Sequence, residues 1–121
     1  MDTGENRIIE LDAQKNTCIR QKLSLKEGRY LLEYDWAVRE GKPVGTAKMS
    51  VHINNEAVQE HTPFDYQVQH GRYAFNVHKQ FPTVELQFCG NGPSDSYGVL
   101  LDNVHLYDLN QCKRILKPLF N

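Results

Sequence analysis

Residues 28–39 read GRYLLEYDWAVR and form the clearest period-two pattern in the chain. Successive side chains of a β-strand point to opposite faces of a sheet, so alternate residues share a face. One alternate set consists of Tyr30, Leu32, Tyr34, Trp36 and Val38, and the other of Leu31, Glu33, Asp35, Ala37 and Arg39. The pattern predicts a strand whose first set faces the core and whose second set faces outward.

Shorter runs of the same kind follow one another along the chain, separated by turn residues. We expect strands at 7–12, 17–25, 47–54, 84–89 and 99–107, a hairpin at 54–56, an irregular crossing at 61–66 and a further strand at 73–77. Residues 109–120 are expected to form a short helical turn or a tail. This organisation predicts an all-β fold, a two-sheet antiparallel β-sandwich of the eight-strand jelly-roll kind. The expected domain is single, residues 1–121, with its core at about 8–108 and a tail at 109–121.

Two of these runs also assign faces. In 47–54 the alternation places Met49, Val51 and Ile53 inward and Lys48, Ser50, His52 and Asn54 outward. In 84–89 it places Val84, Leu86 and Phe88 inward and Glu85, Gln87 and Cys89 outward.

The charge balance limits the range of partners. Fourteen Lys and Arg residues against fifteen Asp and Glu residues give a formal net charge of -1, and no basic stripe stands out. Nucleic acid is therefore not an expected partner. Apolar runs such as 99–101 are far shorter than a bilayer requires, so no membrane insertion is expected. Residues 1–7 show no signal-peptide pattern.

Four blocks of sequence carry a family likeness: IELD at 9–12, GRYLLEYDWAVR at 28–39, VELQF at 84–88 and SDSYGVLLDNVHL at 94–106. In order and spacing they resemble the galactose-binding-like jelly-roll domains of carbohydrate-binding modules. Residues 55–83 match no binding motif of that family. The resemblance implies a non-catalytic module that attaches a larger secreted or cell-surface protein to a glycan.

Three carboxylates suggest a metal site. Glu10 and Asp12 are two residues apart on one expected strand, and sandwich topology brings the closing strand, with Asp102, near the first. Calcium accepts six to eight oxygen ligands in flexible geometry. The resemblance implies a structural calcium at Glu10, Asp12 and Asp102. The alternative is that Asp102 accepts backbone hydrogen bonds or pairs with Arg39, while the other two are solvated.

The expected ligand-binding residues lie on outward positions and in loops. We expect Glu33, Asp35, Arg39, His52, Glu85 and Gln87 to form one polar sheet face that either holds a glycan or is ordinary solvated sheet. Arg39 either grips sugar hydroxyls or ties the fold together. Stacking of a sugar ring requires an exposed aromatic ring, and the candidates are Tyr66, Tyr73 and Tyr97, with plain packing as the alternative.

Catalysis is not expected, because no catalytic motif has the required spacing. Five histidines contain no i, i+2 or i+4 pair. Glu33 and Asp35 point the same way on one strand and cannot flank a glycosidic bond. The alternative to glycan binding is a structural or protein-interaction domain.

Three cysteines, Cys18, Cys89 and Cys112, show no C-x-x-C spacing, and at least one must stay free. We expect Cys18 and Cys89 to be buried or half-buried small hydrophobic residues. A disulfide between Cys112 and either of them is an open alternative.

Overall fold

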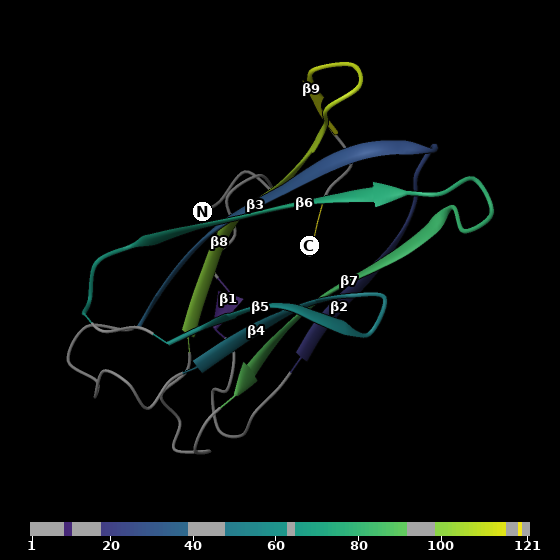
Figure 1. Ribbon diagram of the computed structural model, residues 1–121. Helices are drawn as coiled ribbons and strands as arrows, with labels where there is room; N and C mark the ends of the chain where they lie inside the picture. Colours follow the sequence, from purple (N-terminus) through teal and green to yellow (C-terminus); the bar gives the residue numbers. More distant parts are fainter. Residues whose placement is uncertain are drawn as a thin grey trace.

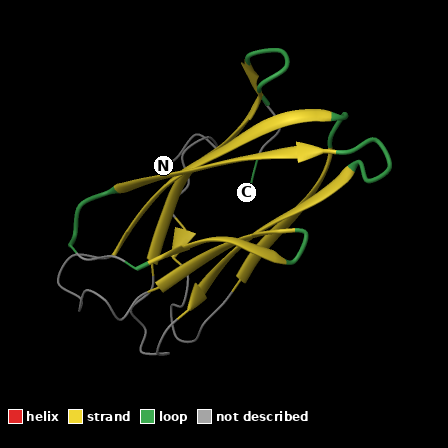
Figure 2. Ribbon diagram, viewed as in Figure 1, coloured by secondary structure: helices red, strands yellow, loops and turns green. Residues whose placement is uncertain are grey.

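A computed structural model describes residues 9–10, 18–38, 48–62, 65–91, 99–115 and 119. Its strands form two facing layers (Figure 1). The strands are β1 Ile9–Glu10, β2 Cys18–Ser24, β3 Gly28–Val38, β4 Lys48–Ile53, β5 Glu56–His61, β6 Gln69–Val77, β7 Thr83–Asn91, β8 Val99–Asp108 and β9 Lys113–Arg114. Figure 2 shows strands joined by loops, and within the described ranges no residue is helical. None of these residues, accordingly, belongs to a helix that could span a membrane.

The strand order is that of a jelly roll. One sheet, which we call sheet A, has the order β1-β8-β3-β6, with β9 also pairing β8; the other, sheet B, has the order β2-β7-β4-β5. All pairings are antiparallel, and β1, β2, β3 and β4 pair with β8, β7, β6 and β5 respectively. This nested pairing confirms the predicted two-sheet antiparallel β-sandwich and its jelly-roll topology.

The core lies between the two sheets, and the phase predicted for residues 28–39 is confirmed. The apolar set of β3 is buried, with exposed fractions between 0% for Leu32 and 6% for Trp36. Met49, Val51 and Ile53 of β4, and Val84, Leu86 and Phe88 of β7, are buried as predicted. Burying such side chains contributes about 1.5–3 kcal/mol each, so these three strands supply much of the stability.

Three outward positions of sheet B are nevertheless covered. Ser50, Gln87 and Cys89 are only 3%, 9% and 6% exposed. Strand β7 lies between β2 and β4, so side chains of both neighbours flank its outer positions. His52, for example, is opposite Gln87, and its Nε2 lies 2.8 Å from the Ser50 hydroxyl. Outward phase on a central strand therefore does not guarantee solvent exposure.

The middle of the chain is more regular than expected. Residues 56–61 form the strand β5, and β6 already begins at Gln69. Asn54 and Asn55 both have positive φ, 53° and 68°, as in the tight turns that return a strand antiparallel to its predecessor. This turn confirms the predicted hairpin and explains why β5 continues as a strand.

Within the described residues 109–115, the segment after β8 forms a turn and the strand β9 rather than the expected helical turn. The Asp108 carboxylate accepts hydrogen bonds from the backbone N–H groups of Asn110 and Gln111, at 2.9 and 3.2 Å. This contact closes a turn that leads into β9, which pairs with the end of β8.

The cysteine prediction also needs correction. Cys18 and Cys89 are directly opposite in the β2–β7 register and form a disulfide, with their Cα atoms 4.1 Å apart. Cys18 is exposed rather than buried. Cys112, the expected candidate for pairing, is a free exposed thiol in the turn before β9.

Candidate functional site

A cluster of polar side chains lies on the outer face of sheet A. Strand β3 runs between β6 and β8, and Glu33 is opposite Arg72 on one side and His105 on the other. Asp35 is opposite His70 and Asp102. We call the following six residues the sheet A face: Glu33, Asp35, His70, Arg72, Asn103 and His105.

Two acid–base pairs order this face. Arg72 Nε lies 2.9 Å from Glu33 Oε2, and His70 Nδ1 lies 2.5 Å from Asp35 Oδ1. The Arg72 and His70 side chains are 67% and 74% exposed, whereas Glu33 and Asp35 are 31% and 23% exposed. Pairs this exposed contribute little to stability. Their effect is to hold two planar, nitrogen-bearing groups over two carboxylates.

A β-bulge in β8 shapes the centre of the face. The β3–β8 register shifts between Glu33 and Asp35, where Asn103 adopts a φ of 53°. Asparagine tolerates this left-handed conformation better than most residues. The Asn103 side-chain amide donates to Asp35 Oδ2 at 2.9 Å, and its backbone N–H donates to Asp102 Oδ1 at 2.8 Å. The bulge thus adds a second group, beside His70, that fixes the Asp35 carboxylate.

The face is hollowed rather than flat. A depression of about 500 Å³ is lined by the six residues of the sheet A face together with Tyr34 and Gly71. A second depression, of about 270 Å³, shares Asp35 and Asn103 with the first and extends toward Ala37, Val68 and Leu100. The larger depression has the size of a small-ligand site.

Directly beneath this face, a polar cluster ties the two sheets together. The Tyr34 hydroxyl lies 2.5 Å from Gln59 Oε1 and 2.6 Å from His61 Nε2, both on β5. Burial raises the pKa of the Tyr34 hydroxyl and lowers the pKa of His61. The His61 ring also stacks on Trp36, with centroids 4.7 Å apart. The floor under the site is therefore held from both layers.

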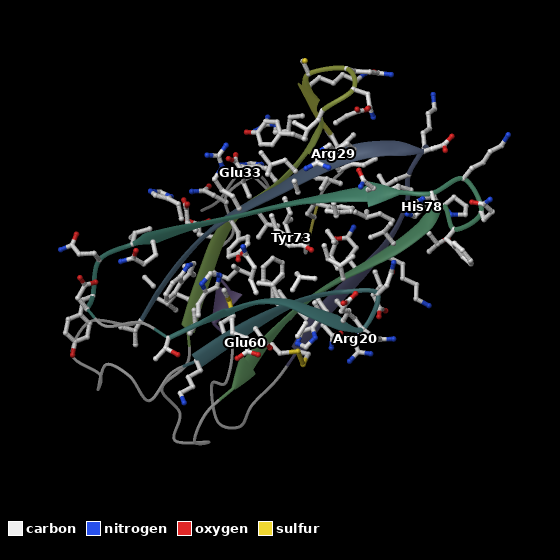
Figure 3. The ribbon with its side chains drawn as sticks, in the orientation of Figure 1. Arg20, Arg29, Glu33, Glu60, Tyr73 and His78 are labelled. Carbon is white, nitrogen blue, oxygen red and sulfur yellow. A yellow bond between two sulfur atoms is a disulfide. The ribbon has the colours of Figure 1, made fainter. Side chains whose placement is uncertain are left out.

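The predicted single polar face does not exist. Glu33 and Asp35 belong to sheet A, but His52, Glu85 and Gln87 belong to sheet B. Figure 3 shows Glu33 and Arg29 on the outside of one layer and Arg20 and Glu60 on the outside of the other. The chain changes layer between β3 and β4, so outward residues of these strands lie on opposite sides of the sandwich. Arg39 lies outside the described residues.

The three tyrosine candidates have different positions. Tyr73 lies within β6 rather than beside a loop, is half-buried against the core, and is seen between the two layers in Figure 3. Tyr66 is 41% exposed, in the loop that precedes β6. Tyr97 lies outside the described part of the chain.

Sequence reasoning missed four of the six residues of the sheet A face: His70, Arg72, Asn103 and His105. Extending the alternation of 73–77 back to residue 69 would have placed His70 and Arg72 outward. His105 could not be placed, because the bulge changes the phase: Leu101 and Leu106 are both buried although they are five residues apart.

The expected metal ligands are only partly described. Strand β1 pairs with β8, with Glu10 opposite Leu100, so the predicted proximity of first and closing strands is confirmed. The Glu10 side chain and all of Asp12 lie outside the description. Among the side chains that are described, no group of three or more metal-ligating residues occurs. The Asp102 carboxylate accepts a hydrogen bond from the backbone N–H of Asn103, which agrees with the alternative that Asp102 accepts backbone hydrogen bonds.

Fold and topology together define the class as a two-sheet antiparallel β-sandwich with jelly-roll topology. The chain is similar in fold to the module TmCBM61, whose structure was solved in complex with beta-1,4-galactotriose. The superposition has a TM-score of 0.58 and covers 88% of this chain and 84% of that chain, at 12% sequence identity. This confirms the resemblance at the level of the fold. No protein-family model and no curated protein matches the sequence.

Proposed function

We propose that this domain is a non-catalytic carbohydrate-binding module that holds a glycan on the sheet A face. The observation that carries the proposal is the larger depression, in which two buttressed carboxylates alternate with exposed nitrogen-bearing side chains. Sugar hydroxyls both donate and accept hydrogen bonds. A surface that presents acceptors and donors side by side, over the width of three strands, suits them.

The existing contacts favour binding over mere solvation. Glu33 and Asp35 are already held by Arg72, His70 and Asn103, so less side-chain freedom is lost when a ligand docks. A carboxylate oxygen can accept from a sugar hydroxyl in addition to its protein partner, since it has two lone pairs. The guanidinium of Arg72 keeps further N–H groups for hydroxyl oxygens.

The first ligand to test is a β-1,4-linked galactose oligosaccharide, because the structurally similar module was solved with one. At 12% sequence identity, that oligosaccharide is a candidate ligand for this chain and nothing more specific. Catalysis is not part of the proposal. Glu33 and Asp35 sit on the same face of one strand and are engaged in pairs, an arrangement that does not place an acid and a base across a bond.

The disulfide supports a secreted or cell-surface location. Cross-links such as the one between Cys18 and Cys89 persist in oxidising compartments. We propose accordingly that the module attaches a larger extracellular protein to a glycan surface.

Two exposed arginines provide the test. Arg72 belongs to the sheet A face, whereas Arg20 lies on the outer face of sheet B. Isothermal titration with galactan oligosaccharides should show about 10-fold or greater weakening in Arg72→Ala, because hydrogen bonds to charged groups contribute about 1.5–3 kcal/mol. The matched variant Arg20→Ala should bind as the wild type does. Equal affinities in all three proteins would refute the proposed site, and blank glycan arrays with stable self-association would favour a protein-interaction domain.

We further propose that Glu10, Asp12 and Asp102 bind a structural calcium ion. The support is the pairing of β1 with β8, which brings the strands bearing Glu10 and Asp102 together. A ligand that binds only the folded state stabilises it by mass action. The melting temperature should therefore rise with added calcium and fall with chelator, and Asp102→Asn should abolish the difference. Identical melting temperatures with calcium and with chelator would refute the proposed calcium site.

A further inference from the structure

We infer that the smaller depression is a subsite for a methyl-bearing substituent of the bound sugar, either the C-methyl of a 6-deoxy sugar or the methyl of an acetyl group. The inference rests on the proposed function and adds to it a preference among glycans. Its basis is a change from polar to apolar side chains on the outer surface of sheet A, at the next outward-facing residue pair beyond Asp35.

The walls of this subsite are apolar and come from three segments. Ala37 extends β3 beyond Asp35, and Leu100 is its partner on β8. Val68, immediately before β6, forms the third wall and is 58% exposed. The side chain of Ala37 is small, which leaves the hollow of about 270 Å³ between its two larger neighbours.

The subsite is continuous with the polar depression. Asp35 and Asn103 line both. A sugar ring whose hydroxyls form hydrogen bonds with Asp35 and the neighbouring residues can thus direct a substituent toward Val68 while it stays on the sheet A face. Removing about one methyl group from water improves affinity roughly fourfold.

Charge narrows the class of substituent. Asp35 and Asp102 both line the subsite, and the described lining contains no lysine, arginine or histidine. A carboxylate or sulfate placed there would face the Asp35 carboxylate, whether or not Asp102 holds the proposed calcium ion. The subsite therefore favours a neutral, apolar substituent over an acidic one.

A set of matched methyl β-glycosides tests the inference. The probes are the D-galactoside, its 6-deoxy analogue, its 2-acetamido analogue and the corresponding galacturonide. Competition against an oligosaccharide bound by the wild type, followed by ligand-observed NMR, should show one of the two methyl-bearing probes binding about fourfold tighter than the galactoside. The acid should bind weakest. The methyl-bearing probe that binds more tightly than the galactoside identifies the substituent, either the C-methyl of a 6-deoxy sugar or the methyl of an acetyl group.

Two variants tie that preference to the subsite. Val68→Ser polarises an exposed wall, and Ala37→Val fills the hollow with a residue that strands accept well. Both should reduce the methyl preference to about onefold and leave galactoside affinity unchanged, whereas Arg72→Ala should weaken all probes alike. Equal binding of methyl-bearing and parent probes by the wild type, or a preference that survives in both variants, overturns the subsite while the proposed function stands. Absence of binding to any glycan would overturn the proposed function and the subsite together.

Discussion

The outer faces of the two sheets are built from the same alternation, and each sheet contains a register shift, between β3 and β8 in sheet A and between β4 and β5 in sheet B. On sheet B, β2 and β7 pair through seven consecutive residues without a register shift, and a disulfide links them. On sheet A, the pairing of β3 with β8 breaks at Asn103. The outward residues Ser50, Gln87 and Cys89 of sheet B are nearly covered, while His70 and Arg72 of sheet A project into solvent.

This difference shows what turns a polar sheet face into a candidate site. Polar side chains alternate outward on both sheets, so composition does not distinguish them. Both sheets also contain a register shift, so the distinguishing feature of sheet A is that its shift places Asn103 beside Asp35 on a hollowed surface. We therefore regard sheet B as the layer reinforced by the disulfide and sheet A as the layer that carries the proposed glycan site.

The largest expected effect concerns the disulfide of sheet B. The two cysteines are 71 residues apart, and closing a loop of that length in the unfolded chain stabilises the fold by about 4 kcal/mol in the chain-entropy treatment. In a Cys112→Ser background, urea unfolding with and without reductant should differ by about 2–4 kcal/mol. Glycan affinity of the reduced, still folded protein should be unchanged, because the sheet A face lies on the other layer. Loss of binding before unfolding would contradict the division between the layers.

Gly71 should give the next largest effect. It is buried in β6, opposite Tyr34, and a β-carbon at this position would overlap the Tyr34 ring. Gly71→Ala should reduce the free energy of unfolding by about 3 kcal/mol, since overpacking costs 1–3 kcal/mol and the displaced ring would lose its hydrogen bonds to β5.

A double-mutant cycle with Tyr34→Leu provides the control for Gly71. Without the ring, the added methyl has room, so the penalty of Gly71→Ala should fall by more than half. Strict additivity in urea unfolding would show that the ring contact is not the cause.

Residues 28–39 illustrate how much the sequence could predict. Alternation gave the buried set of β3 correctly, because a central strand between two others has one face in the core along its whole length. The nesting of β1 beside β8 was also foreseeable from sandwich topology. Glu33 and Asp35 were placed on the right kind of surface for the same reason.

The layer of each strand could not be predicted from alternation. A period-two pattern indicates which residues share a face of a strand, but it does not indicate which sheet the strand joins. His52 and Gln87 were therefore grouped with Asp35, although a complete sandwich separates them. The pairing of Cys18 with Cys89 was missed for the same reason, since it depends on β2 lying beside β7.

Asn103, at the bulge in β8, offers a test with a smaller expected effect on stability. Alanine and glycine both remove the amide that donates to Asp35, but only glycine accepts the φ of 53° without strain. Asn103→Ala should be about 1 kcal/mol less stable than Asn103→Gly in chemical unfolding. Both should weaken glycan binding about equally. If the two variants are equally stable, the bulge is not set by the backbone of this residue.

The smallest expected effect is a pH dependence of stability from His61, under the sheet A face. The Gln59 amide nitrogen donates to the Arg72 carbonyl oxygen, so Gln59 Oε1 must accept the Tyr34 hydroxyl proton. Tyr34 Oη then accepts from His61 Nε2–H, which neutral histidine provides. Because burial lowers the pKa of folded His61 below its usual 6.5, the unfolded chain binds the proton more readily. The contribution of His61 to the free energy of unfolding should be fully present above about pH 6.5 and should decline as the pH falls through the folded pKa.

Urea unfolding between pH 5 and pH 8 should show this decline in the wild type and a shallower one in His61→Gln, which keeps a nitrogen donor but does not titrate. Parallel pH profiles would mean that the decline arises from other groups and that His61 does not couple the two layers to pH.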